Sequence, residues 1–319
     1  MKGDILFYRF PHGDVQQTFG VFEKVNQFSP NSGFILSDFN WEEKFIFIET
    51  KSEPKLYFRN DEVNCLSKEE YIVSASLFLN QLRNKQLSKA IFSRVKKVQG
   101  SFEIEKLFKQ LCDTYPDAFV YLVSSPLFGT WIGATPEVLL ESSGGKAKTI
   151  ALAGTIAVNS QEEWSEKEIE EQQYVVDFVT RKLNDSSIQE LEISQKMELI
   201  AGPVKHLVTN FNFQLPQNDV LALIQELHPT PAVSGLPRED SLELIEEIES
   251  HERRFYAGVI GFISEYETKL FVNLRCAEIQ ENSSFLYVGG GFTKDSDVEK
   301  EWNETERKAE TLLNVMQKN

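Results

Sequence analysis

Glu171 places a carboxylate where its own helix should be apolar. Residues 165–184 have helical spacing, and the positions three, four and seven residues after Glu171 are Tyr174, Val175 and Phe178. Burying a lone charge is costly, so this carboxylate must be paired, protonated or bound to a metal. A buried salt bridge and a cation site therefore both remain open for Glu171.

Two further carboxylates lie on the last predicted helix, whose start is marked by a capping box, Ser296 and Glu299. Glu301, Glu304 and Lys308 follow one edge of its apolar stripe. One interpretation is a surface ladder of i,i+4 pairs. The other, taken together with the buried carboxylate above, is a site for a hard cation. Magnesium prefers oxygen ligands and typically uses one or two carboxylates plus oxygens of the substrate.

Arg275 adds a cation to a predicted strand over residues 269–280. Alternation puts Phe271, Asn273, Arg275 and Ala277 on one face, so the guanidinium projects from the middle of the strand. An arginine in this position is suited to bidentate capture of a carboxylate. A structural pair with a glutamate is the alternative.

Gly289–Gly291 lie at the end of the next predicted strand. They are not a phosphate loop, because no Gly-Lys-Ser or Gly-Lys-Thr follows. Glycines at a strand end let a ligand's carboxylate approach backbone N–H groups, and a simple bulge is the alternative. His228–Pro231 is predicted to be a rigid turn fixed by its prolines, in which a lone histidine is more often structural than catalytic.

These residues must be positioned by strands and helices that alternate irregularly along the chain. The predicted strands cover residues 34–36, 44–48, 118–125, 130–141, 148–155, 256–264, 269–280 and 285–291. The predicted helices cover residues 69–83, 104–114, 165–184, 218–227, 241–250 and 296–318. Several strands follow one another without an intervening helix, which indicates antiparallel meanders and an α+β fold.

The composition disfavours several classes of partner. Lys and Arg total 33 and Asp and Glu total 49, and the net charge of −16 disfavours nucleic acid and anionic membranes. Cys65, Cys112 and Cys276 are too scattered for a disulfide framework and favour a reducing compartment, the cytoplasm. The first residues, MKGDILFYRFPHGD, do not resemble a signal peptide. No apolar run approaches the roughly 18 residues of a membrane span.

Several short segments, taken in order, resemble the chorismate-binding enzymes, a family of isochorismate, salicylate, anthranilate and aminodeoxychorismate synthases. The matching segments are Lys89–Arg94, Gly133–Glu137, Ala151–Thr155, Lys167–Glu171, His228–Val233, Arg253–Gly258, Leu274–Cys276, Gly289–Gly291 and Asp295–Lys308. The resemblance implies one domain, residues 1–319, of two packed, mostly antiparallel sheets surrounded by helices. A β-rich part (1–64) would precede the chorismate-binding core (65–315).

The resemblance also implies a site for chorismate and Mg²⁺. The metal would be held by Glu171 and Glu304, with Glu301 close by. The residues implied to hold chorismate are Gly154, Thr155, Ala232, Val233, Tyr256, Arg275, Gly289 and Lys308. This agrees with the carboxylates and the arginine that stand out in the sequence on their own.

Two positions indicate the reaction that the resemblance implies. Ala153 stands where some aminodeoxychorismate synthases carry a covalent lysine, and Lys89 stands where anthranilate synthases typically have glutamine. A lysine there is typical of enzymes that use water as the nucleophile, which favours an isochorismate synthase. Lys89 would be the general base for a water that attacks C2, and Glu137 the acid that protonates the departing C4 hydroxyl.

Salicylate synthase, which also eliminates pyruvate, shares these residues and is the nearest alternative. An anthranilate synthase-type subunit would need a glutaminase partner, and Lys89 argues against it. A non-catalytic chorismate-binding protein is the third alternative. Gln172 departs from the family pattern, because many members have histidine after the metal-binding glutamate. We expect a monomer whose product serves menaquinone or siderophore biosynthesis.

Overall fold

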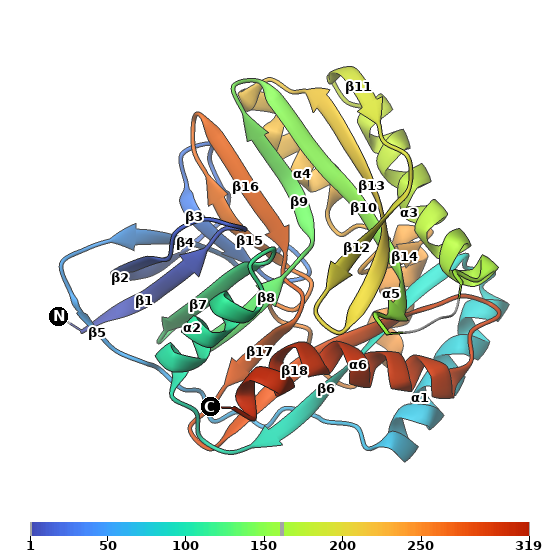
Figure 1. Ribbon diagram of the computed structural model, residues 1–319, viewed down its shortest axis with the longest axis horizontal. Coiled ribbons are helices and arrows are strands. Elements are labelled where there is room, and N and C mark those ends of the chain that lie inside the picture. The colour runs from blue at the N-terminus through green and yellow to red at the C-terminus, as the bar shows by residue number, and fades with distance from the viewer. Residues whose placement is uncertain (1, 160–162, 319) are drawn as a thin grey trace.

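The computed structural model describes residues 2–159 and 163–318 (Figure 1). Its six described α-helices are α1 (Lys68–Asn84), α2 (Ile104–Thr114), α3 (Glu166–Asn184), α4 (Val220–Leu227), α5 (Arg238–Ile248) and α6 (Val298–Met316), with a 3-10 turn η1 (Gln217–Asp219) before α4. Every predicted helix is present, with its ends shifted by a few residues at most. The helices pack around a large, mostly antiparallel sheet, which confirms the α+β fold.

Strand β1 (Lys2–Arg9) is the point at which the sheet divides into two branches. The first branch continues through β2 (Gln16–Val25), β4 (Lys44–Glu49), β3 (Gly33–Ser37), β15 (Val259–Ile263), β16 (Glu267–Val272), β9 (Val138–Ser143), β10 (Lys146–Ala157) and β13 (Val204–Gln214), to which β11 (Gln189–Ile193) and β12 (Met197–Ala201) both pair. The second branch continues through β7 (Phe119–Ser125), β8 (Gly129–Thr135), β17 (Cys276–Ile279), β18 (Ser283–Phe292), β6 (Lys89–Gln99) and β14 (Gly235–Leu236). The short β5 (Glu53–Pro54) pairs with β1 in parallel. The two expected sheets are thus two branches of one hydrogen-bonded network.

Two short connections carry the chain from one branch to the other. Pro136 and Glu137 join β8 of the second branch to β9 of the first. Asn273, Leu274 and Arg275 join β16 of the first branch to β17 of the second. We call these connections the first and second crossing. Their residues lie where the two branches meet.

The sequence predicts unbroken strands over residues 130–141 and 269–280, and both predictions are wrong. Pro136 has no N–H to donate to a strand ladder, so β8 ends before it. Arg275 has a φ of 50°, in the left-handed region that no regular strand uses. Arg275 therefore does not project from the middle of a strand but from the second crossing.

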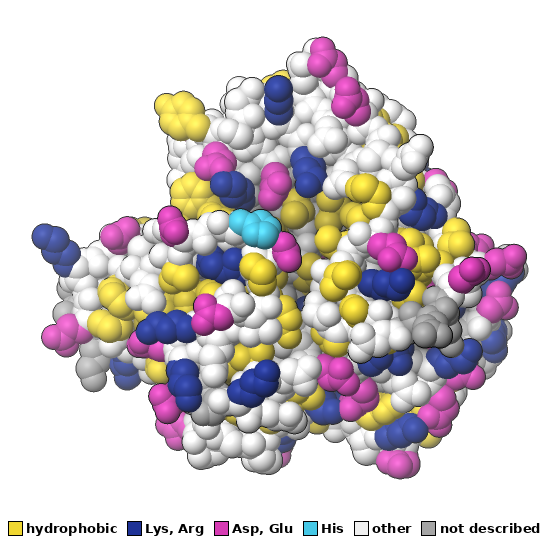
Figure 2. Space-filling model, viewed as in Figure 1, with side chains coloured by type: hydrophobic (Ala, Val, Ile, Leu, Met, Phe, Trp, Pro, Cys, Tyr) yellow, Lys and Arg dark blue, Asp and Glu magenta, His cyan; other side chains and the backbone are white. Residues whose placement is uncertain are grey.

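The surface carries both signs of charge. On the face in Figure 2, acidic and basic side chains are interspersed, so the net charge of −16 is not gathered into one patch there. No helix within the described part of the chain is long and apolar enough to cross a membrane. A small anion would therefore be attracted by a local group of cations inside the fold rather than by the surface as a whole.

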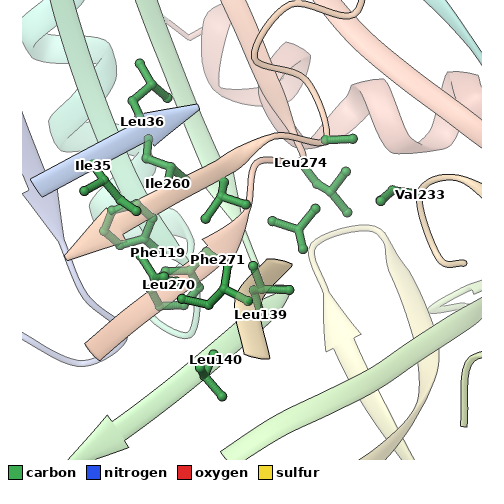
Figure 3. Close-up of a cluster of buried hydrophobic side chains, with 14 of the residues drawn as sticks. Ile35, Leu36, Phe119, Leu139, Leu140, Val233, Ile260, Leu270, Phe271 and Leu274 are labelled. Carbon is green, nitrogen blue, oxygen red and sulfur yellow. The ribbon is translucent and has the colours of Figure 1, made fainter. Parts of the chain in front are cut away.

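The two branches are held together by a core of aromatic and aliphatic side chains (Figure 3). Phe119 of β7 stacks on Phe271 of β16, with ring centroids 4.6 Å apart and an interplanar angle of 5°. Leu274 and Val233 belong to the same cluster. Because interiors are closely packed, this core fixes the separation of the branches and hence the shape of any cavity between them.

Helix α3 lies against β10 and α6 lies against β18, so the two acidic helices approach the meeting point of the branches. The start of α6 differs from the predicted capping box of Ser296 and Glu299. Asp297 caps the helix instead, by accepting a hydrogen bond from the Lys300 N–H. The Ser296 hydroxyl is free for another task and donates to Glu301 Oε1.

The sequence did not predict strands β1, β2, β5, β6, β11 to β13 and β14, of which β6 carries Lys89. The segments QELEI of β11 and MELIA of β12 are mostly exposed, so their hydrophobic pattern shows no buried face. β13 reads VKHLVTNFNFQ and has clear strand character, but its register against β10 depends on residues some 60 positions earlier. β13 carries His206, which lines the cavity where the two branches meet.

Candidate active site

A small cavity opens where the two branches meet. Both branches and both crossings contribute to its wall. The lining residues are Ile91, Pro136, Glu137, Leu152, Ala153, Gly154, Thr155, Glu171, His206, Ala232, Val233, Tyr256, Leu274, Arg275, Gly289, Gly291 and Lys308. This mixture of apolar walls and a few convergent polar groups is typical of a site for a small molecule.

Arg275 enters the cavity from the second crossing and is held by His206 of β13. Its Nη2 donates to His206 Nε2 over 3.2 Å, while His206 Nδ1 lies 2.8 Å from the Gly154 carbonyl oxygen. A carbonyl only accepts, so Nδ1 carries the proton and Nε2 is the acceptor. Burial, together with the charges of Arg275 and Lys308, lowers the pKa of His206 to about 3. The ring is therefore neutral and can fix the guanidinium without repelling it.

Glu137 occupies the first crossing, and its residue is only 4% exposed. Burial raises the pKa of its carboxyl group to about 7, although Lys89, Arg275 and Lys308 act in the opposite direction. Its carbonyl oxygen accepts a hydrogen bond from the Val272 N–H, which ties the first crossing to the end of β16. Glu137 is thus a rigidly held carboxyl group that can keep a proton near neutral pH.

Glu171 of α3 and Lys89 of β6 form a buried ion pair. Lys89 Nζ lies 3.0 Å from Glu171 Oε1, and the lysine side chain is 0% exposed. Gly291 makes this approach possible, because a Cβ atom there would lie 2.2 Å from the same oxygen. Lys89 is behind the lining of the cavity, whereas Glu171 is part of it. The salt bridge left open for Glu171 by its sequence position is therefore present.

The edge of α6 continues this row of charges. Lys308 Nζ lies 2.7 Å from Glu304 Oε1 and donates to the Gly289 carbonyl oxygen over 2.8 Å. Glu301 pairs with Lys167 of α3 through Oε1, and its side chain is 1% exposed. The predicted surface ladder is therefore wrong: the Glu304–Lys308 pair exists, but it is largely buried against β18.

The carboxylates of Glu171, Glu301 and Glu304 fit a hard cation in their chemistry. All offer oxygen ligands, and two carboxylates with substrate oxygens would suffice for magnesium. Glu301 Oε2 is buried without a hydrogen-bond partner among the described residues. Burial and the neighbouring Glu304 raise the pKa of Glu301, a repulsion that a cation would relieve. Within residues 2–159 and 163–318, no group of three acidic, cysteine or histidine side chains is already arranged as a metal cage.

Backbone groups complete the cavity at Gly154 and Gly289. Gly154 has a φ of 69°, and a Cβ atom there would lie 3.0 Å from the Glu168 carbonyl oxygen. A Cβ atom on Gly289 would lie 2.9 Å from the hydroxyl of Tyr256. Burial raises the pKa of Tyr256, so this hydroxyl keeps its proton and can donate to a ligand. The two glycines thus let the Glu168 backbone and the Tyr256 hydroxyl approach the wall of the cavity closely.

Most of the predicted site residues meet in this one cavity. Those in its lining are Glu137, Gly154, Thr155, Glu171, Ala232, Val233, Tyr256, Arg275, Gly289 and Lys308. Lys89, Glu301 and Glu304 lie behind the lining, in the ion pairs described above. His206 was missed, although a histidine between apolar residues in VKHLV is a buried polar group that needs an explanation.

The protein is thus an α+β protein whose branched sheet encloses a cavity that contains Arg275 and Lys308. The sequence model of the family described as "Chorismate binding enzyme" matches residues 37–317, and the chain belongs to this family.

Among curated relatives, the isochorismate synthase EntC of Escherichia coli K12 is 31% identical over 245 residues, which are 72% of this chain and 62% of EntC. The isochorismate synthase MenF of Bacillus subtilis is 29% identical over 266 residues, 79% of this chain and 56% of MenF. The matched regions thus span about three fifths of these relatives.

Two solved structures have the same fold. DhbC of Bacillus anthracis superposes with a TM-score of 0.84 at 24% identity, covering 99% of this chain and 96% of that chain. The menaquinone-specific isochorismate synthase MenF of Escherichia coli gives a TM-score of 0.83 at 20% identity, with coverage of 99% and 89%.

Proposed function

We propose that the protein is an isochorismate synthase, which isomerises chorismate to isochorismate with the aid of Mg²⁺. The main support is Glu137, a buried carboxyl group whose pKa is raised to about 7 in a cavity that also holds Arg275 and Lys308. Lys89 lies close enough to lower that pKa. An acid and a base that both face one substrate are suited to moving protons on and off it. The relatives EntC and MenF are both named isochorismate synthases.

Chorismate has two carboxylates, and the cavity offers two cations that can bind them. In our proposal, Arg275 and Lys308 provide the charge and Tyr256 donates from its hydroxyl. The backbone near Gly154, Thr155, Ala232, Val233 and Gly289 supplies the remaining contacts. Arg275 Nε has no hydrogen-bond partner among the described residues, which supports a ligand-binding role for this side chain.

Glu171 and Glu304 would hold the magnesium ion, with Glu301 beside them. Bound there, the metal would offset the negative charge of a substrate carboxylate. The proposal assigns one water molecule as the nucleophile. Lys89, in its uncharged amine form, takes a proton from this water as its oxygen bonds to C2, and the ring double bonds shift. Glu137 gives its proton to the C4 hydroxyl, which leaves as water, so the atoms of substrate and product balance.

Incubation of the purified protein with chorismate and Mg²⁺, followed by chromatography, tests the proposal. We expect isochorismate in equilibrium with chorismate, and no conversion once EDTA is added. Salicylate with pyruvate would make the protein a salicylate synthase, and anthranilate formed with ammonia would make it an anthranilate synthase-type subunit. No product under any of these conditions would refute the proposal and leave a chorismate-binding protein.

Lys89→Ala should abolish turnover while chorismate still binds, as measured by calorimetry. Lys97→Ala is the matched control, because Lys97 lies on the same strand, outside the cavity lining. We propose a cytoplasmic monomer that acts without a glutaminase subunit.

A further inference from the structure

Strand β6, which carries Lys89, loses its neighbouring strand part of the way along one edge. β14 pairs only with Lys89 and Ala90, and the Ile91 N–H then donates to the Ser234 carbonyl oxygen over 2.8 Å. The preceding residues, Ala232 and Val233, turn away to line the cavity. The next backbone groups on this edge are buried and need other partners.

Two charged side chains take the place of the missing strand. Arg253 Nη2 donates to the Ile91 carbonyl oxygen over 2.9 Å, and Glu249 Oε1 accepts from the Ser93 N–H over 2.6 Å. The two side chains form an ion pair of 2.6 Å and are 4% and 3% exposed. Neither is among the residues that line the cavity, and both are hydrogen-bonded to the strand and to each other.

Arg253 also ties the strand to the cavity wall. Its Nη1 donates to the Val233 carbonyl oxygen over 2.7 Å, while its Nε donates to Glu249 Oε2 over 2.8 Å. The guanidinium carbon lies 4.4 Å from the centre of the Phe39 ring, which covers one face of the group. One planar group therefore bridges β6, the wall at Val233 and Glu249 at once. A lysine, with its single ammonium group on a flexible stem, cannot reproduce this planar fork.

We propose that Arg253 and Glu249 are positioning residues, which set the distance between the Val233 wall and the strand that carries Lys89. The inference rests on the proposed function. It identifies the residues that hold the Val233 wall of the cavity in place. The wall contacts the substrate before, during and after the reaction, so loosening it weakens ground state and transition state alike. Uniform weakening of this kind raises KM and leaves kcat almost unchanged.

Arg254 provides a matched control. It pairs with the buried Glu278, donates to the Phe128 carbonyl oxygen over 3.0 Å, and its side chain is 16% exposed. It lines no part of the cavity. Arg253→Lys and Arg254→Lys should therefore both lower the thermal unfolding temperature, but only Arg253→Lys should alter substrate binding.

The experiment compares steady-state kinetics of the wild type, Arg253→Lys and Arg254→Lys with chorismate and saturating Mg²⁺. We expect Arg253→Lys to raise KM about tenfold with kcat changed less than about threefold, and Arg254→Lys to leave both within about twofold. Equal effects of the two substitutions, or an unchanged KM in Arg253→Lys, would overturn the inference.

Glu249→Asp is the second variant, in case Arg253→Lys does not fold. It keeps the charge balance but withdraws the carboxylate from Ser93, so KM should rise here too, and an unchanged KM would count against the inference. A wild type that converts no chorismate would defeat the proposed function itself, and the inference with it. A wild type that converts chorismate with none of these KM changes would defeat the inference alone.

Discussion

Glu137 keeps its proton because it is buried and in spite of three nearby cations. The protonated form is the one that can act as an acid, so kcat should fall as pH rises through about 7. Glu137→Gln should lower kcat by about 10²- to 10⁴-fold, the usual contribution of general acid catalysis. Stopped assays between pH 5.5 and 9 measure both effects. Glu141→Gln, on β9 and outside the cavity, is the control and should keep the wild-type profile.

His206 should affect substrate binding through Arg275. His206→Leu removes the acceptor of the Arg275 Nη2 hydrogen bond, and KM should rise about tenfold or more, in line with hydrogen bonds to charged groups. His206→Gln offers a carbonyl oxygen and should recover part of this loss. Because the pKa of His206 is about 3, the rise in KM should be the same from pH 6 to 9. A KM equal to that of the wild type in His206→Leu would show that Arg275 is held by other means.

The charged residues that stood out in the sequence without the family resemblance share one property: each has a type that is costly where its own element puts it. Glu171 stood out because it interrupts an apolar stripe, and its burial is confirmed. Lys89 and Glu137 have no such local signal and were assigned only by family resemblance. His206 was not predicted as a site residue because the strand that carries it was not predicted. Nothing in the neighbouring sequence shows that it contacts Arg275, 69 positions later.

Strand β18 and helix α3 approach each other where Gly291 faces Glu171. Gly291→Ala would place a methyl group against the Glu171 carboxylate and near the Lys89 side chain, so the buried ion pair between them must shift. We expect a loss of about 1–3 kcal/mol in the free energy of unfolding, typical of an overpacked core, and weaker Mg²⁺ binding. Urea unfolding and calorimetry with Mg²⁺ measure these. Gly13→Ala, whose added methyl would meet only the Phe10 residue, should change neither by a comparable amount.

Helices were predicted well because each has an apolar stripe and polar ends, both of which are local. Strands were predicted less well for two different reasons. The exposed β11 and β12 have no buried face, and the two crossings break strands whose alternation continues through the break. The left-handed backbone of Arg275 is imposed by the change of branch, which is a property of the fold and not of the neighbouring residues.

His228 joins the turn before Val233 to the N-terminal part of the chain, at Phe39 just after β3. Its Nε2 lies 3.0 Å from the Phe39 carbonyl oxygen, and burial lowers its pKa to about 4. The unfolded chain takes up a proton below about pH 6.5, whereas the folded protein does so only near pH 4, so acid favours unfolding. The free energy of unfolding should therefore fall by about 1.4 kcal/mol per pH unit in this interval from His228 alone.

Urea unfolding at pH 7.5, 5.5 and 4.5 checks this dependence. His228→Gln can still donate to Phe39 and does not titrate, so its slope should be smaller than that of the wild type. His206 contributes with the same sign as His228, whereas the raised pKa values of Glu137 and Glu301 contribute with the opposite sign, so the difference between the two slopes is what reports on His228. Parallel curves for the wild type and His228→Gln would contradict the assignment.

The N-terminal part, residues 1–64, and the core, residues 65–315, form one domain in our proposal. β1 pairs with both β2 and β7, and β3 pairs with β15, so the N-terminal strands join the two branches. A chain without residues 1–64 should not fold, because the branches would lose their common strand and expose the core. Circular dichroism and gel filtration test this, and a compact, cooperatively unfolding truncated protein would contradict it.

The two crossings have a consequence for how the protein is made. Glu137 and Arg275 are brought together through bonds such as that from the Val272 N–H to the Glu137 carbonyl oxygen, and Lys308 follows still later in the chain. A ribosome must therefore release the chain beyond Lys308 before the whole lining of the cavity can assemble. Until then, the nascent chain exposes apolar strands while the site is still incomplete. Contacts between residues so distant in sequence also form slowly. Translation yields no partially active form, so activity appears only when the last helix has docked.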